Sequence, residues 1–183
     1  IDKPLTFNSD QAKKLVEKVN ETNLPFAVTH TYTGYPMVKE AKYLIKSGKI
    51  GNIRKVAVEY PQGWLTSNLE NTDNKQASWR TDPKKSGKAG SMGDIGTHAA
   101  NMVEYLTGKK ILKLFSKVNT FVKGRLLEDD GNVLISLEDG IEGNLMTSQI
   151  ATGEENDLKI RVWGELGGIE WKHSMPNTLL LKL

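Results

Sequence analysis

The stretch GDIGTHAAN at residues 93–101 is the most informative part of this 183-residue sequence. Asp94 and His98 are four residues apart, so a helix would project both side chains from one face. Gly93 suits a helix start, and apolar residues recur behind the pair at helical spacing: Ile95, Ala99, Met102, Val103 and Leu106. The pattern predicts a helix over residues 94–107 that buries one stripe and holds an Asp–His pair in its first turn.

An Asp–His pair in the first turn of a helix has more than one interpretation. The carboxylate can favour the imidazolium and fix the ring, which suits acid/base chemistry near neutral pH. Alternatively, Asp94 caps the helix and His98 lies on its surface. The pair could also ligate a metal ion, but no third Asp, Glu or His follows at a recognisable spacing, so we predict no metal site.

The beginning of the chain predicts the tail of a domain that is otherwise absent. Residues 8–21 show a helical pattern that Asn8 or Ser9 can cap, with a buried stripe of Ala12, Leu15, Val16 and Val19. A short buried strand is predicted at residues 26–30. A strand-like start, a helix and a strand form the end of a βαβ unit, the crossover that completes a parallel sheet.

The rest of the chain predicts an α+β arrangement. Residues 37–47 favour a helix that Gly48 ends, residues 53–60 alternate as a strand, and residues 61–92 predict a long irregular excursion of the kind that carries function. Further strands are predicted at 111–123, 131–138, 141–151, 158–164, 168–172 and 178–182. Acidic and glycine turns between them favour antiparallel hairpins. Because the chain lacks an initial Met and stops inside an apolar run, we expect it to be cut at both ends.

Four segments that occur in a fixed order carry a resemblance: DKPLT at residues 2–6, YTGYP at 32–36, Trp79-Arg80, and Gly93-Asp94 followed by His98. Together they resemble the Gfo/Idh/MocA family of NAD(P)-dependent sugar and polyol dehydrogenases, although Asp2 stands where that family usually has Glu. The resemblance makes residues 1–32 the C-terminal tail of a Rossmann dinucleotide-binding domain. Residues 33–183 become a substrate-binding and oligomerisation domain with an open, mainly antiparallel sheet and helices on one face. It also implies a cytoplasmic protein.

Oxidising a secondary alcohol requires a base for the hydroxyl proton and a donor that polarises the forming carbonyl. The resemblance places Lys3, Asp94 and His98 in one site, with His98 as the acid/base, Lys3 as the donor and Asp94 as an assisting carboxylate. Lys3 and Pro4 would line the nicotinamide end of an NAD or NADP cofactor. Each residue also has a structural interpretation: Lys3 as a solvated strand-end lysine, and the pair as a cap and a surface histidine.

Aromatic and forked side chains are candidates for binding the substrate. Tyr32 could donate a hydrogen bond to a sugar hydroxyl or pack in the core, and Trp79 with Arg80 offers an aromatic face and a forked donor. Gln62 and Trp64 are weaker candidates of the same kind. His30 is interpreted as a strand-end histidine whose hydrogen bonds are satisfied. His173 stands isolated among strand residues and is assigned no role.

Composition excludes several classes of protein. The net charge of +3 is small and the charges of both signs are interspersed, so we expect no nucleic acid as a partner. No cysteine is present, which excludes disulfides and thiolate chemistry, and no apolar run approaches a membrane span. Neither glycine cluster, at residues 87–93 or 164–168, has the spacing and context of a dinucleotide-binding loop, so the main cofactor-binding loop is predicted to be absent.

Two other functions compete with a dehydrogenase. A non-catalytic family member could serve as a binding or assembly module, and a glycoside hydrolase would need a second carboxylate beside Asp94. In strands 111–123, 131–138 and 141–151, apolar residues occupy both odd and even positions, which point to opposite faces of a sheet. This predicts a second apolar sheet face. We expect that face to form a homodimer or homotetramer, unless a further segment of the same subunit covers it.

Overall fold

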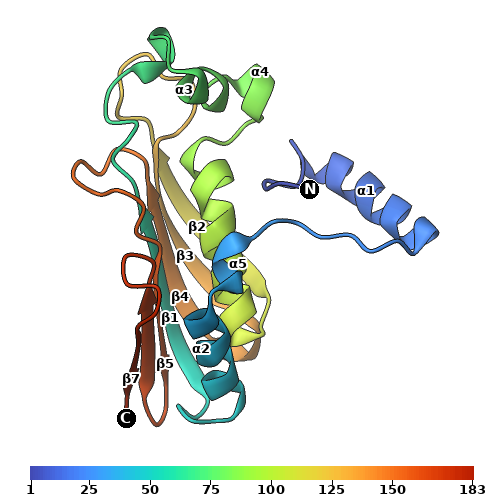
Figure 1. Cartoon of the computed structure of the whole chain (residues 1–183), viewed down its shortest axis with the longest axis vertical. Coiled ribbons are helices and arrows are strands. Elements are labelled where there is room, and N and C mark those ends of the chain that lie inside the picture. Colours follow the sequence, from blue (N-terminus) through green and yellow to red (C-terminus); the bar gives the residue numbers. More distant parts are fainter.

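A curved, open sheet of seven strands forms the body of the structure, a computed structural model that describes residues 1–183 (Figure 1). The strands are β1 (Ile53–Pro61), β2 (Ile111–Asn119), β3 (Asp130–Leu137), β4 (Glu142–Ser148), β5 (Lys159–Gly164), β6 (Gly168–Lys172) and β7 (Leu179–Lys182). Their order in the sheet is β2-β3-β4-β1-β5-β6-β7, and only β1 and β4 run parallel. The predicted α+β fold with a mainly antiparallel sheet is therefore confirmed.

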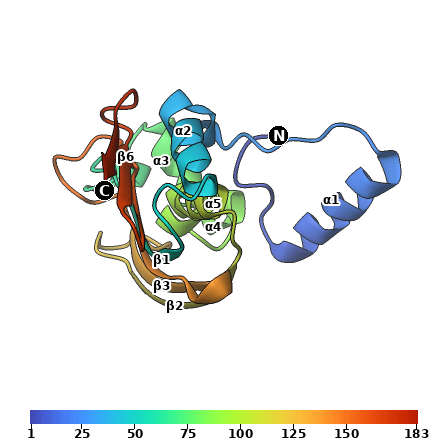
Figure 2. The same cartoon turned by 90° about the horizontal axis from the view of Figure 1, so that it is seen from below.

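Helices α2 (Pro36–Lys46) and α5 (Thr97–Thr107) cover one face of this sheet (Figure 2). The apolar stripe predicted for the second helix is buried in full, from Ile95 to Leu106. Val133, Ile135 and Leu137 of β3 point toward the same side and join the stripe in one core of 22 residues. None of the helices is long and apolar enough to cross a membrane.

The helix that carries Asp94 and His98 begins earlier than predicted, because a π-helical turn, η3 (Met92–Gly96), precedes α5. Asp94 lies within this wide turn and His98 lies in the first turn of α5. Single π turns inside helices occur frequently at functional sites, where they displace side chains from regular helical positions.

The excursion at residues 61–92 is more ordered than predicted. It contains η2 (Leu69–Asn71), α3 (Lys75–Arg80) and α4 (Pro83–Ser86), and the side chains of Asn74 and Asp82 cap the two α-helices. Helices this short have no apolar periodicity to detect. The Asn74 and Asp82 caps were the local signal available for them.

The N-terminal arm lies away from the sheet (Figure 2). Its helix α1 (Ser9–Thr22) is capped by Asn8 as predicted, but none of its residues is buried, so the predicted buried stripe is wrong in this chain. Residues 26–30 form no strand, and Phe26 is 44% exposed. The Ile1 amine donates to Ala27 O and Thr29 N donates to Ile1 O, which is the hydrogen-bond pattern of two parallel strands. The arm then continues through η1 (Thr31–Gly34) into α2.

The second face of the sheet is less apolar than the sequence predicted. In β3 the buried and exposed residues alternate cleanly, and Leu134 is the apolar side chain exposed on the open face. Consecutive apolar residues are exposed in the two edge strands, in β2 at Leu112, Leu114, Phe115 and Val118 and in β7 at Leu180 and Leu181. Strand β2 also ends at Asn119 rather than residue 123, because the Asp129 carboxylate accepts the backbone N–H groups of Phe121 and Val122 and turns the chain.

Candidate active site

A cavity of about 370 Å³ opens at the end of the sheet where η3 lies. Its volume falls within the range of small-molecule sites. Side chains from both ends of the chain line it: Lys3, Tyr32, Tyr60, Gln62, Trp64, Gln76, Arg80, Asp94, Ile95, His98 and Asn156.

The sheet topology explains why three amide side chains meet here. Because β1 and β4 are parallel, their carboxyl ends lie at the same end of the sheet, and Gln62 and Gln149 directly follow them. Strand β5 is antiparallel to β1 and starts at that end, so Asn156 in the preceding loop reaches the same place.

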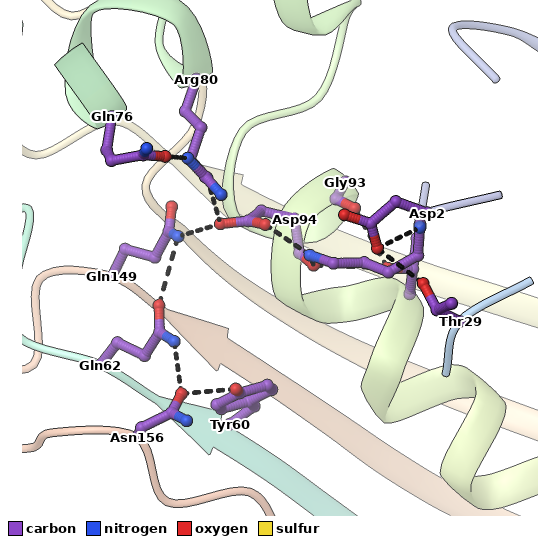
Figure 3. Close-up of polar contacts among 12 residues, drawn as sticks. Asp2, Thr29, Tyr60, Gln62, Gln76, Arg80, Gly93, Asp94, Gln149 and Asn156 are labelled. Atoms are coloured by element: carbon purple, nitrogen blue, oxygen red, sulfur yellow. Dashed lines mark hydrogen bonds and ion pairs between the residues drawn. The ribbon is translucent and has the colours of Figure 1, made fainter. Parts of the chain in front are cut away.

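Asp94 is the centre of the charged part of the site. Lys3 Nζ donates to Asp94 Oδ1 at 2.6 Å and to the Asp94 backbone oxygen at 2.6 Å. The other carboxylate oxygen accepts from Gln149 Nε2 at 2.9 Å and lies 3.3 Å from Arg80 Nε (Figure 3). Asp94 therefore does not cap a helix. It holds two cations that come from distant parts of the chain.

His98 is buried, with 8% of its surface exposed, so it does not lie on the helix surface. The rings of Tyr32, His30 and Tyr60 surround it at centroid distances of 4.9, 5.7 and 6.3 Å. Burial lowers the pKa of His98 to about 4, and the charges of Lys3 and His30 act in the same direction. The ring is therefore neutral at physiological pH, and a neutral imidazole can accept a proton.

A chain of uncharged groups forms the opposite wall (Figure 3). Asn156 Oδ1 accepts from Tyr60 Oη at 2.5 Å and from Gln62 Nε2 at 2.7 Å, while its amide nitrogen donates to the Tyr32 hydroxyl at 3.0 Å. The two tyrosine hydroxyls also contact each other. Burial raises the pKa of Tyr60 above its usual value, so this phenol stays protonated and remains a hydrogen-bond donor.

The structure brings most of the predicted site residues together. Lys3, Tyr32, Arg80, Asp94 and His98 line the cavity, as do the weaker candidates Gln62 and Trp64. Pro4 and Trp79 lie beside a smaller neighbouring cavity that also touches Arg80 and Asp94. There the Trp79 ring packs under the Arg80 guanidinium, 4.2 Å from its centre.

Sequence reasoning missed Tyr60, Gln76, Gln149 and Asn156, which come from strand ends, a loop and a short helix with no motif. It was also wrong about two histidines. His173 is not isolated, because its Nε2 meets the Tyr35 hydroxyl at 3.1 Å and its Nδ1 meets the Asn156 backbone oxygen at 2.7 Å. His30 is not satisfied, because its Nδ1 is buried without a partner in the chain.

The two glycine clusters lie at tight turns and close backbone approaches. Gly164 and Gly167 form the tight turn between β5 and β6, with Gly164 N donating to Gly167 O. Gly90 packs against the backbone of Glu128, whose carboxylate accepts the Gly90 N–H at 2.8 Å. Neither cluster joins a strand to a following helix, the arrangement with which a Rossmann domain holds pyrophosphate.

Comparisons with known proteins place this geometry in context. A family model described as the GFO/IDH/MocA C-terminal domain matches residues 38–170. Levoglucosan dehydrogenase of Pseudarthrobacter phenanthrenivorans is 32% identical, over 97% of this chain and 50% of that protein. The crystal structure of an inositol dehydrogenase homolog of Azotobacter vinelandii complexed with NAD+ is 32% identical, with a TM-score of 0.95 over 100% of this chain and 47% of that one. The same homolog complexed with NADH and myo-inositol is 29% identical, with a TM-score of 0.89 over 100% of this chain and 46% of that one. The chain thus spans about half the length of the curated relatives that it matches along its whole length.

Proposed function

This chain belongs to the GFO/IDH/MocA family, and from that premise we propose that it is the substrate-binding and catalytic part of an NAD(P)-dependent dehydrogenase. The reaction transfers a hydride between the nicotinamide and a secondary hydroxyl of a sugar, polyol or related cyclic substrate. The observation that carries the proposal is the meeting of Lys3 with Asp94, 91 residues away in the sequence, in the cavity that His98 also lines.

The three residues divide the work around the reacting hydroxyl. His98 is neutral and its Nε2 is not buried, so this atom takes the hydroxyl proton as the alcohol is oxidised. Lys3 uses two of its three N–H groups on Asp94, which leaves one to donate to the substrate oxygen. Asp94 keeps that ammonium group in place and offsets its charge.

The residues present fit the reactive end of a nicotinamide cofactor. A proton acceptor and a cationic donor face one cavity, which is the donor set that alcohol oxidation needs beside a hydride acceptor. When bound, the nicotinamide supplies that acceptor. Lys3 and Pro4 would lie against its ring, and a segment outside the described residues would hold its phosphates. The choice between NAD and NADP depends on that segment.

The uncharged wall is suited to binding a polyhydroxylated substrate. Tyr32, Tyr60, Gln62 and Asn156 offer hydroxyl and amide groups that both donate and accept, as a sugar's hydroxyl groups do. Arg80, backed by the Trp79 ring, adds a fixed donor at the rim. We assign substrate binding to Tyr32 and Arg80 directly, and to Trp79 through its support of Arg80.

We also propose that residues 1–32 complete a Rossmann domain and that residues 33–183 form the substrate domain. The parallel pairing of Ile1 with residues 27–29 and the uncovered apolar side of α1 support this division. On this proposal the 183-residue chain alone binds neither NAD+ nor NADP+. Calorimetric titration with both nucleotides is the test, and tight binding of either would contradict the division.

The proposed partner of the chain is a second copy, docked through the open face of the sheet. Opposite charges face each other there: Lys159 Nζ lies 3.3 Å from Glu59 and Lys182 Nζ lies 3.3 Å from Glu170. A twofold axis can match such a patterned surface to itself. Light scattering should show a dimer or tetramer, and Leu134→Lys on that face should yield monomers. A monomeric wild-type protein would contradict the interface.

Activity is tested in the protein that carries this chain together with its nucleotide-binding segment. We expect NAD+ or NADP+ to be reduced with at least one member of a sugar and polyol panel, and Lys3→Met to lower the rate of that reduction by roughly two to four orders of magnitude. Lys14→Met, on exposed helix α1, is the matched control and should retain activity. If the wild type binds cofactor and polyol but transfers no hydride, the chain is instead a non-catalytic binding module.

A further inference from the structure

Two histidines from different parts of the chain lie edge to face at the wall of the cavity. His30 ends the N-terminal arm and His98 lies in the first turn of α5, and their ring centroids are 5.7 Å apart at an interplanar angle of 86°. Only His98 lines the cavity. His30 lies behind it, half-buried, and its backbone oxygen accepts Thr33 Oγ1 at 2.9 Å, which fixes the residue at the start of η1.

The nitrogens of the two rings are arranged alike. In each ring Nδ1 is buried and has no hydrogen-bond partner in the chain, whereas Nε2 is not among the buried unpaired atoms and is therefore accessible. The two rings are in edge-to-face contact, and each thus has one buried, unpaired nitrogen and one accessible nitrogen. A buried unpaired polar atom costs free energy, so its occurrence in two neighbouring rings calls for an explanation.

We propose that His30 relays the substrate proton from His98 to solvent, a role that rests on the dehydrogenase function proposed above. His98 Nε2 takes the hydroxyl proton, and His98 Nδ1 releases its own proton to His30 Nδ1, either directly after ring rotation or through one bridging water. His30 then releases the proton on its Nε2 to solvent. One proton enters and one leaves, and both rings end as the opposite neutral tautomer.

The relay matters while substrate and cofactor fill the cavity, because His98 Nε2 then has no direct access to solvent. After the product leaves, proton exchange at the two Nε2 atoms restores the starting tautomers. In the reverse reaction the same path delivers a proton to the carbonyl oxygen.

The surrounding charges are compatible with this path. Three charged side chains act on His98: Lys3 and Asp2 on the arm and Asp94 on η3. The rings of Tyr32 and Tyr60, which also face it, are neutral. Burial and the charge of Lys3 lower the pKa of His30 as well. Each ring therefore carries one proton and not two near neutral pH, so each can accept a proton at one nitrogen and release one from the other, as a relay requires.

The experiment compares His30→Phe and His30→Gln with the wild-type protein that includes its nucleotide-binding segment. Phenylalanine keeps a flat ring, and glutamine can form a hydrogen bond but cannot relay a proton between two nitrogens. We expect both variants to lower kcat by about tenfold with KM unchanged, and to enlarge the solvent deuterium isotope effect on kcat. Added imidazole should restore kcat in His30→Phe.

A merely structural role for His30 gives a different result. If His30→Phe loses kcat and imidazole does not restore it, or if kcat and the isotope effect stay within twofold of wild type, the relay is wrong.

A second readout does not depend on activity. Nuclear magnetic resonance titration of the histidines should show that His30→Phe shifts the midpoint of His98, and an unchanged midpoint also overturns the proposal. A wild type that reduces no cofactor but retains this coupling would refute the dehydrogenase function while leaving the histidine pair intact.

Discussion

The two amphipathic helices α1 and α5 have similar sequence patterns and different surroundings. Helix α5 buries six of its residues against the sheet, whereas α1 buries none. The arm that carries α1 meets the body through Lys3 and Asp94, the residues to which we assign the chemistry. An amphipathic pattern thus shows that a helix has an apolar side but not what covers it. Here the arm and the body are joined at the proposed active site.

The largest expected effect tests whether arm and body form one catalytic unit. His98→Ala in the body and Lys3→Met in the arm should each lower turnover by roughly two to four orders of magnitude. Because both act on the same hydroxyl group, the double variant should lose little more than the worse single variant. Steady-state rates of NAD(P)+ reduction measure this. If the rate loss of the double variant instead equals the product of the two single losses, the two residues serve different steps.

The next effect contrasts ion pairs in the two regions. Arg125 in the body is buried and donates to Glu70, Asp129 and the backbone oxygens of Leu65 and Ser67. Arg125→Gln leaves the buried Asp129 and the partly buried Glu70 without their cation, so the free energy of unfolding in urea should fall by about 3–5 kcal/mol.

The matched control breaks an exposed pair on the arm. Lys18 and Glu21 of α1 are 2.9 Å apart but largely exposed, so Glu21→Gln should change stability by less than about 0.5 kcal/mol. Equal losses for the two variants would show that burial does not decide the strength of these pairs.

The same contrast explains how much the sequence could predict. Helix 94–107 and the antiparallel strands followed from apolar periodicity and turn residues, which are local signals. Gln149 and Asn156 could not be predicted, because they reach the site through the pairing of β1 with β4 and with β5, long-range choices that no local pattern encodes. The stripe of α1 was predicted correctly as apolar but not as uncovered, since covering depends on segments other than the helix itself.

A smaller effect concerns the stability of the protein at acidic pH. The pKa of His98 is lowered to about 4 from the usual 6.5, so its neutral, buried form contributes stability that is complete above pH 6.5 and declines as pH falls toward 4. We expect a loss on the order of 1–3 kcal/mol over this range, less than the full shift because the ring adjoins an open cavity. Urea unfolding at pH 7 and pH 4 measures it. In His98→Gln this part of the pH dependence should disappear, and an unchanged slope would contradict the assignment.

The last contrast tests the uncovered helix directly. Leu15 of α1 and Leu106 of α5 undergo the same truncation to alanine, but only Leu106 is buried. In the 183-residue chain, Leu106→Ala should cost about 2–5 kcal/mol, whereas Leu15→Ala should cost less than about 1 kcal/mol. Joined to the nucleotide-binding segment that we propose, the α1 stripe gains a cover, and the cost of Leu15→Ala should rise toward that of Leu106→Ala. A cost that stays small in the longer protein would mean that α1 is not part of a Rossmann domain, and that the arm serves only to deliver Lys3 to Asp94.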